Sequence, residues 1–175
     1  MRFVRKVTAL FLLFTGIGAV NRAQATDERS HPADTATIKA ITDLRDVWAR
    51  HLSLREVDSA VAMYAPTAIF IDPHGTREVG RESLRKLFTF VVSSFDSDLH
   101  FEPRSISVEG DVTTDSGNFR ELLHQRGDAP DAVIPLSGRY TTRYRRESDG
   151  QWKIVEQEWT LGQGGHPQKK SDATK

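Results

Sequence analysis

Residues 65–75 read Ala65-Pro66-Thr67-Ala68-Ile69-Phe70-Ile71-Asp72-Pro73-His74-Gly75. This stretch marks a change from helix to sheet, because a helical pattern ends before Pro66 and a short apolar run follows it. Side chains alternate along a strand, so Phe70 and Asp72 are expected on the same face. Pro73 and Gly75 then turn the chain. The stretch therefore predicts an apolar strand with one acid at its end.

Two helical patterns precede this strand. Asp34 or Thr35 can cap the first helix, and Arg45 is predicted on its solvent-facing side. The apolar positions of this helix recur at helical spacing and are Ile38, Ile41, Leu44, Trp48 and Leu52. A second, shorter helix is expected to begin within residues 53–56 and to stop at Pro66.

A third helix and four long strands are expected after the strand. Gly80 opens the helix, which carries apolar residues at Leu84, Leu87, Phe88, Val91 and Phe95. From Leu99 onward the apolar period changes to alternation, and Pro103 marks a bulge or bend. Further strands are predicted over residues 112–124, 136–146 and 151–161. Helices with apolar stripes against one sheet give an α+β domain, and a strongly curved sheet would leave a cavity beneath the helices.

The first 25 residues resemble a secretory signal peptide. Arg2, Arg5 and Lys6 precede an apolar core of about 14 residues, too few to span a bilayer, and Ala23-Gln24-Ala25 is a small-x-small cleavage site. Residues 26–34 are expected to be a flexible lead-in and residues 162–175 a disordered tail. The protein is therefore expected to be exported, to the periplasm or the medium, without a membrane anchor after cleavage.

Charge and cysteine content narrow the class of protein. The 25-residue leader holds four of the 24 basic residues and none of the 24 acidic ones, so the mature chain carries a net charge of −4. This sign argues against nucleic acid as a partner. The chain has no cysteine, so a disulfide framework is excluded and stability must come from a packed core. The sequence also has no phosphate-binding loop, nucleophile elbow or His-Glu-x-x-His motif.

Five features of residues 35–161 occur together: Met63-Tyr64-Ala65, Ala68 to Gly75, Gly80-Arg81-Glu82, Asp149-Gly150 and Trp159. In these features the sequence resembles the nuclear transport factor 2-like superfamily. Its SnoaL-like members include ketosteroid isomerases and small exported proteins of unknown function. The resemblance implies a cone-shaped α+β fold in which three N-terminal helices pack on a strongly curved, mixed and mostly antiparallel sheet. It also implies a homodimer formed through the open sheet face.

The resemblance gives Asp72 a candidate role. In ketosteroid isomerases the acid before the proline of this corner is the catalytic base, and Asp72 matches it. Trp48 stands where the oxyanion-binding tyrosine of the first helix is expected, and Tyr140 near the position of the protonated acid. Each of them can donate a hydrogen bond. The alternative for Asp72 is a turn cap that binds nearby backbone N–H groups.

Other residues carry weaker signals. His74 is a second catalytic candidate, because histidine is the residue type that exchanges protons near neutral pH; the alternative is a loop residue that faces solvent. A metal site at Asp72 and His74 would need another ligand, and none has a recognisable spacing, so no metal is expected. Aromatic residues that could line a ligand pocket, or simply form core, are Trp48, Tyr64, Phe70, Phe88, Tyr140 and Trp159.

A run of arginines marks the expected strand over residues 136–146. Arg139, Arg143, Arg145 and Arg146 could bind an anion, or could form a solvated or edge face, and Glu121 on the neighbouring strand could pair with them.

Two hypotheses follow. In the first, the protein binds a small apolar or aromatic molecule and carries out acid–base chemistry at Asp72, of the isomerase, dehydratase or cyclase kind, for which no cofactor is required. In the second, it is a non-catalytic ligand-binding or dimerisation module.

Overall fold

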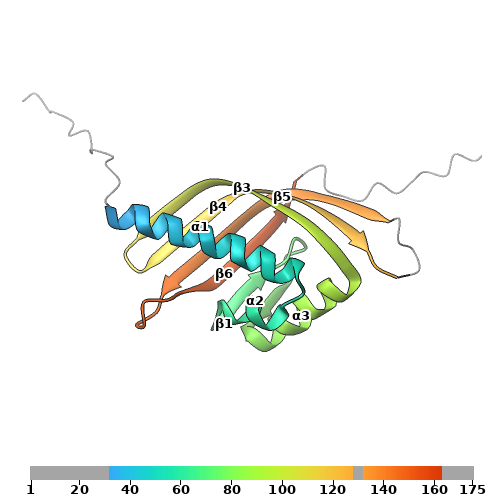
Figure 1. Ribbon diagram of the computed structural model, residues 1–175, viewed down its shortest axis with the longest axis horizontal. Helices are drawn as coiled ribbons and strands as arrows, with labels where there is room; N and C mark the ends of the chain where they lie inside the picture. The colour runs from blue at the N-terminus through green and yellow to red at the C-terminus, as the bar shows by residue number, and fades with distance from the viewer. Residues whose placement is uncertain (1–31, 128–131, 163–175) are drawn as a thin grey trace, which may run out of the picture.

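The computed structural model describes residues 32–127 and 132–162, which form a layer of helices against one sheet (Figure 1). The elements, in chain order, are α1 (Pro32–Ser53), α2 (Val57–Ala62), β1 (Tyr64–Ile71), β2 (Arg77–Val79), α3 (Gly80–Ser94), β3 (Phe95–Glu109), β4 (Val112–Gln125), β5 (Val133–Arg146) and β6 (Trp152–Leu161). The predicted signal peptide, most of the lead-in and all but the first residue of the tail lie outside the described residues. In the part of the chain that is described, no helix is both long enough and apolar enough to cross a bilayer.

The six strands form one mixed sheet in the order β2-β1-β6-β5-β4-β3. All neighbours are antiparallel except β1 and β6, which run parallel. This arrangement confirms the predicted mixed, mostly antiparallel sheet. The β3–β4 register shifts between Pro103 and Ser105, which confirms the bend predicted at Pro103.

The helices cover the concave face of the sheet. Figure 1 shows α1 lying across the strands, with α2 and α3 at one end and the long β3 bending over them. Along β5, the buried side chains of Tyr140, Thr142 and Tyr144 alternate with exposed residues, which are Arg139, Thr141, Arg143 and Arg145. The strand period of two thus turns every second residue toward the helices and leaves the other face open to solvent.

The start of β1 is fixed by an arginine from α3. Arg81 Nε donates a hydrogen bond to the carbonyl oxygen of Tyr64 over 2.8 Å, and its Nη2 donates to that of Ala62 over 3.4 Å. These bonds satisfy carbonyls at the point where helix gives way to strand. The hydrogen bonds of Arg81 hold the beginning of α3 against the junction between α2 and β1.

Local boundaries differ from the sequence-based ones. The helix α1 already begins at Pro32, because proline suits the first turn of a helix, where its missing N–H costs nothing. The second helix begins at Val57, after a turn, and Tyr64 already belongs to β1. The placement of Arg45 on the solvent side is wrong, since its residue is only 6% exposed.

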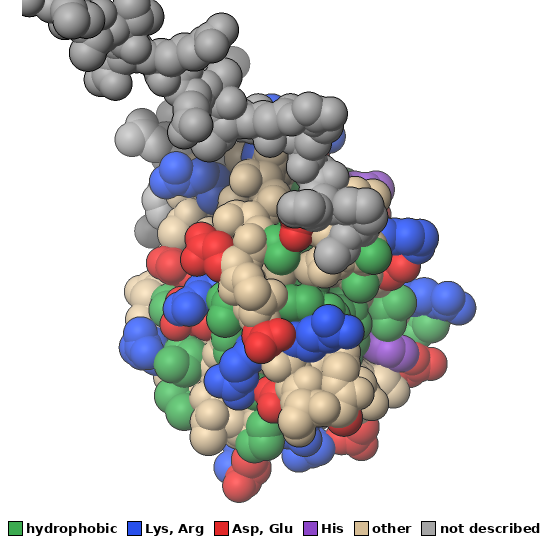
Figure 2. All heavy atoms as spheres, turned by 90° about the vertical axis from the view of Figure 1, so that its left-hand side faces the viewer, with side chains coloured by type: hydrophobic (Ala, Val, Ile, Leu, Met, Phe, Trp, Pro, Cys, Tyr) green, Lys and Arg blue, Asp and Glu red, His purple; other side chains and the backbone are tan. Residues whose placement is uncertain are grey.

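The left-hand end of the molecule in Figure 1 faces the viewer in Figure 2. Acidic and basic side chains are interspersed there, with hydrophobic ones between them. This face therefore shows no extended patch of a single sign.

Candidate functional site

The main cavity of the described residues, about 610 Å³ in volume, lies between the helices and the concave sheet face. The second half of α1, the helix α3, the turn after β1 and the bent ends of β3 to β6 all contribute to its wall. Most of the wall is aliphatic or aromatic, as in sites for small apolar molecules.

Four of the predicted ligand-binding aromatics meet at this cavity: Trp48, Phe70, Phe88 and Trp159. The Trp48 ring lies 6.0 Å from that of Phe88 and 6.1 Å from that of Trp159, measured between centroids. The indole N–H groups of Trp48 and Trp159 are buried and have no hydrogen-bond partner among the described residues. A buried donor without a partner costs free energy.

Asp72 and His74 also line the cavity, at the turn after β1. Asp72 Oδ1 accepts hydrogen bonds from the backbone N–H groups of His74 and Thr76, each over 2.8 Å. No described residue donates to Asp72 Oδ2. The carboxylate therefore has the geometry of a turn cap and still borders the cavity with its second oxygen uncommitted, so both interpretations of Asp72 stay open.

The two predicted tyrosines lie outside the cavity wall. The Tyr64 side chain is fully buried and its hydroxyl donates to the Gln157 amide oxygen. Burial raises the pKa of Tyr64 well above its ordinary value. Tyr140 donates its hydroxyl proton to Asp115 Oδ1 over 3.1 Å, and burial raises its pKa too. Neither hydroxyl is thus placed to bind a molecule beside Asp72.

A buried ion pair, missed in the sequence, occupies the other half of the α1–sheet interface. Arg45 Nη1 donates to Asp115 Oδ2 over 3.0 Å, and the Asp115 side chain is 0% exposed. Burial raises the pKa of Asp115, while the guanidinium opposes that shift. The spacing of residues in α1 indicates that Arg45 is buried, because it lies four residues after Ile41 and three before Trp48, on the apolar stripe of the helix.

A second missed residue is Glu121, which lines the main cavity from β4. Burial raises the pKa of its carboxyl, and a hydrogen bond from Ser97 opposes the shift. The predicted pairing of Glu121 with the arginines is wrong, because its neighbours across the sheet are Leu99 and Leu136. Residue parity could have shown this, since Glu121 shares the face of Phe119, which is buried.

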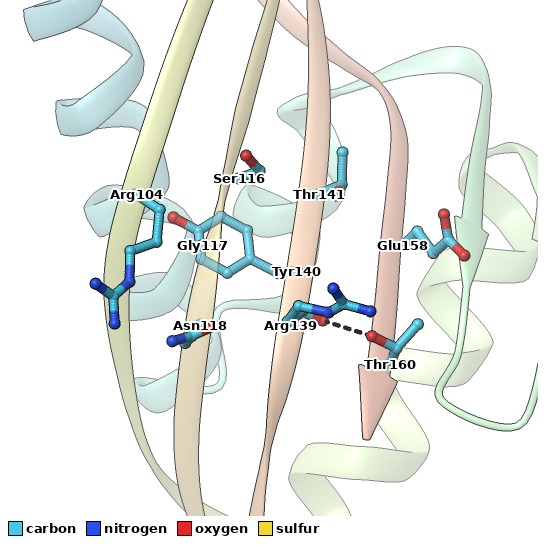
Figure 3. Close-up of a pocket in the computed structure, with 9 residues that line it drawn as sticks. All are labelled: Arg104, Ser116, Gly117, Asn118, Arg139, Tyr140, Thr141, Glu158 and Thr160. Carbon is cyan, nitrogen blue, oxygen red and sulfur yellow. Dashed lines mark hydrogen bonds between the residues drawn. The ribbon is translucent and has the colours of Figure 1, made fainter. Parts of the chain in front are cut away.

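All four arginines of β5 are exposed, and alternation along the strand places Arg139, Arg143 and Arg145 on the open face of the sheet. They do not mark an edge, because β5 lies between β4 and β6. Arg139 borders a shallower hollow of about 400 Å³ together with Arg104 of β3 and Glu158 of β6. Figure 3 shows these side chains projecting from neighbouring strands among hydroxyl and amide groups. This hollow is polar, whereas the main cavity is apolar.

A metal site at Asp72 and His74 would need a third ligand close to them. Within residues 32–127 and 132–162, no three His, Asp or Glu side chains lie close enough together to hold a metal ion.

Helices on the concave side of a six-stranded, mostly antiparallel sheet, with an apolar cavity between them, define the nuclear transport factor 2-like fold. The SnoaL-like domain family model matches residues 33–158, and the chain belongs to this family. No curated protein matches the sequence significantly.

Solved structures confirm the fold at low sequence identity. A ketosteroid isomerase-like protein from Erwinia carotovora atroseptica is 14% identical, with a TM-score of 0.62 over 70% of this chain and 94% of its own. A proposed scytalone dehydratase from Novosphingobium aromaticivorans is 16% identical, with a TM-score of 0.67 over 74% of this chain and 86% of its own. A conserved protein from Planctomyces limnophilus is 14% identical, with a TM-score of 0.67 over 73% and 98% of the two chains.

Proposed function

We propose that this protein binds a small apolar or aromatic molecule in the main cavity and performs cofactor-independent acid–base chemistry on it, of the isomerase, dehydratase or cyclase kind. The observation that carries the proposal is an aromatic cavity of about 610 Å³ that also holds carboxyl groups. An apolar wall excludes water and strengthens proton transfer and charge stabilisation inside it. Two of the structural neighbours, the ketosteroid isomerase-like protein and the proposed scytalone dehydratase, support the reaction class. The proposal includes export, on the leader-like pattern of residues 1–25.

Native mass spectrometry of the protein from its own exported compartment tests ligand binding. A co-purifying small molecule is expected on the wild type. Leu136→Trp, which places a large ring in the cavity wall, should lose that molecule. Glu158→Gln, on the open sheet face, should keep it, because its side chain borders the other hollow. Equal occupancy of the wild type and Leu136→Trp would contradict binding in this cavity.

Substitution of Asp72 separates catalysis from turn capping. Asp72→Asn keeps an oxygen that can accept both backbone hydrogen bonds but removes the base, so turnover of the identified ligand should fall by about 100-fold or more. Asp72→Ala removes the cap and should cost about 1 kcal/mol of unfolding free energy. Unchanged turnover in Asp72→Asn would leave Asp72 with the structural role alone.

The second candidate function is a non-catalytic ligand-binding or assembly module. It is favoured by the two backbone hydrogen bonds to Asp72, which are sufficient to explain an aspartate at this turn. In this candidate a second copy would pack on the open sheet face, through polar and charged side chains such as Arg139 and Glu158. Sedimentation of the wild type and of Arg139→Glu would show whether that face pairs.

A further inference from the structure

Glu121 is an acid in an apolar part of the main cavity. Its side chain is half-buried on the concave face of β4, and its neighbours across the sheet are Leu99 of β3 and Leu136 of β5. Ser97 Oγ donates a hydrogen bond to Glu121 Oε1 over 2.5 Å. A half-buried carboxyl between two leucines has less water around it than an exposed one, so its charged form is less well stabilised.

No described cation pairs with Glu121. The arginine next to it in sequence, Arg120, lies on the opposite face and pairs with Glu102 over 2.5 Å. Arg55 and Arg126, near the cavity rim, both bind Asp96. The fold therefore gives Glu121 no structural partner beyond one serine, although an unpaired acid in such a place is costly.

We propose that Glu121 recognises the polar end of the cavity ligand, and that this ligand is a flat apolar molecule bearing an oxygen acceptor such as a carboxylate or carbonyl. The inference rests on the proposed function, because it assigns the ligand class of the same cavity. The aromatic wall would take the rings, and the carboxyl would donate its proton in a hydrogen bond to the oxygen.

The protonation state of Glu121 decides which ligands it accepts. Burial raises its pKa, so the neutral form persists to higher pH than for an exposed glutamate. A neutral carboxyl can donate to a carboxylate, whereas an ionised one repels it.

Other titratable groups border the same space. Charged and titratable residues of the cavity wall besides Glu121 are Arg50, Arg55, Asp72, His74, Asp96 and Asp98. Glu121 also contributes to a second hollow, together with Asp98, His100 and Arg120. The wall residues from α3, β5 and β6 are all uncharged. A pH effect on binding must therefore be assigned to Glu121 by substitution and not by pH alone.

Two probes that differ in a single group test the inference: naphthalene and 2-naphthoate, which stays an anion from about pH 5 to about pH 8. Binding is followed by quenching of tryptophan fluorescence, since Trp48 and Trp159 line the cavity. In the wild type, 2-naphthoate affinity should fall by about tenfold or more as pH rises across this range, while naphthalene affinity stays constant. In Glu121→Gln, which keeps the size and a donor, the 2-naphthoate affinity should no longer depend on Glu121 ionisation and should lose most of its pH dependence.

Ser97→Ala adds a readout that a purely structural role would not move. Because the serine hydrogen bond lowers the pKa of Glu121, its removal should shift the midpoint of the 2-naphthoate pH curve to higher pH. Asp98→Asn, in the same wall, is the matched control and should leave the curve in place.

The outcomes separate the two proposals. If naphthalene binds, but 2-naphthoate binding is independent of pH or keeps its full pH dependence in Glu121→Gln, the role of Glu121 is overturned and the cavity remains a ligand site. If neither probe binds the folded wild type, the cavity itself is not a site for flat apolar molecules, and both proposals fail.

Discussion

Two neighbouring positions in the second half of α1 face opposite environments on the same sheet. Arg45 lies against a closed polar interface in which Asp115 accepts from both Arg45 and Tyr140. One turn later, Trp48 faces an open cavity and its N–H has no partner in the described chain. Phe101 lies between the two regions, 5.9 Å from the Arg45 guanidinium carbon and 6.3 Å from the Trp48 ring.

The two regions differ in how completely their buried polar groups are hydrogen-bonded. At the closed end, which consists of Arg45, Asp115 and Tyr140, the charges and the tyrosine hydroxyl are paired with one another. The hydroxyl of the buried Thr113 has no described partner. At the cavity end, the indole of Trp159 has no partner and Glu121 has only a serine, while the walls are apolar. Glu121 lines the cavity, so a ligand can supply the partner that its carboxyl lacks.

The largest effect is expected from breaking the closed end. Asp115→Asn keeps the shape but leaves the Arg45 charge without its buried partner, so it should lower the free energy of unfolding by about 3–5 kcal/mol in urea titrations. Asp46→Asn is the matched control, because Asp46 binds the same guanidinium at 3.3 Å with a 66% exposed side chain. It should cost less than about 1 kcal/mol. Equal losses would show that burial does not set the strength of this pair.

The double variant Arg45→Met with Asp115→Leu sharpens that comparison. Replacing both charges with apolar groups of similar size removes the cost of an unpaired charge, so much of the lost stability should return. Naphthalene binding should persist in this variant, since neither residue lines the main cavity. Loss of binding would show that the closed end and the cavity form a single unit.

A smaller effect, opposite in sign, is expected at the cavity end. The pKa of Glu121 is raised in the folded state, so its contribution to stability is fully present below the unfolded pKa and is lost as pH rises through the folded pKa. Glu121→Gln should therefore have little advantage at about pH 4 and should be more stable than the wild type at about pH 8. Urea titrations at both pH values check this. A constant difference would mean that the carboxyl is not desolvated.

The comparison also explains what the sequence could predict. The bend at Pro103 and the turn after Asp72 are local patterns, and the structure confirms both. The change from helix to strand is also present, but it falls before Tyr64 and not at Pro66, which lies inside β1. Residue type alone predicts an exposed Arg45, whereas its position on the apolar stripe of α1 determines its burial. Glu121 lies on the strand next to the arginines of β5, but alternation along β4 turns its side chain to the opposite face.

The sequence predicts that a cavity can form beneath the helices, but it does not predict the size of the cavity or all the residues that line it. Its existence depends on how far β3 to β6 bend away from α3, and curvature is a property of the whole sheet. Likewise, the separation of Tyr140 from the cavity follows from its hydrogen bond to Asp115, a residue 25 positions earlier in the chain. Such pairings appear only once the strands are in register.

The smallest effect concerns the point where α1 ends at the cavity rim. Arg55 has a φ of 61°, a left-handed conformation that normally favours glycine, and closes the helix with a bond from its N–H to the Leu52 carbonyl. Arg55→Gly relieves this conformation and Arg55→Ala does not, while both lose the exposed ion pair to Asp96. We therefore expect the glycine variant to be more stable than the alanine variant by about 1 kcal/mol in urea titrations. If the two variants have the same free energy of unfolding, the backbone at residue 55 adopts another conformation at no cost. The rim of the cavity would then deform more easily than the closed end.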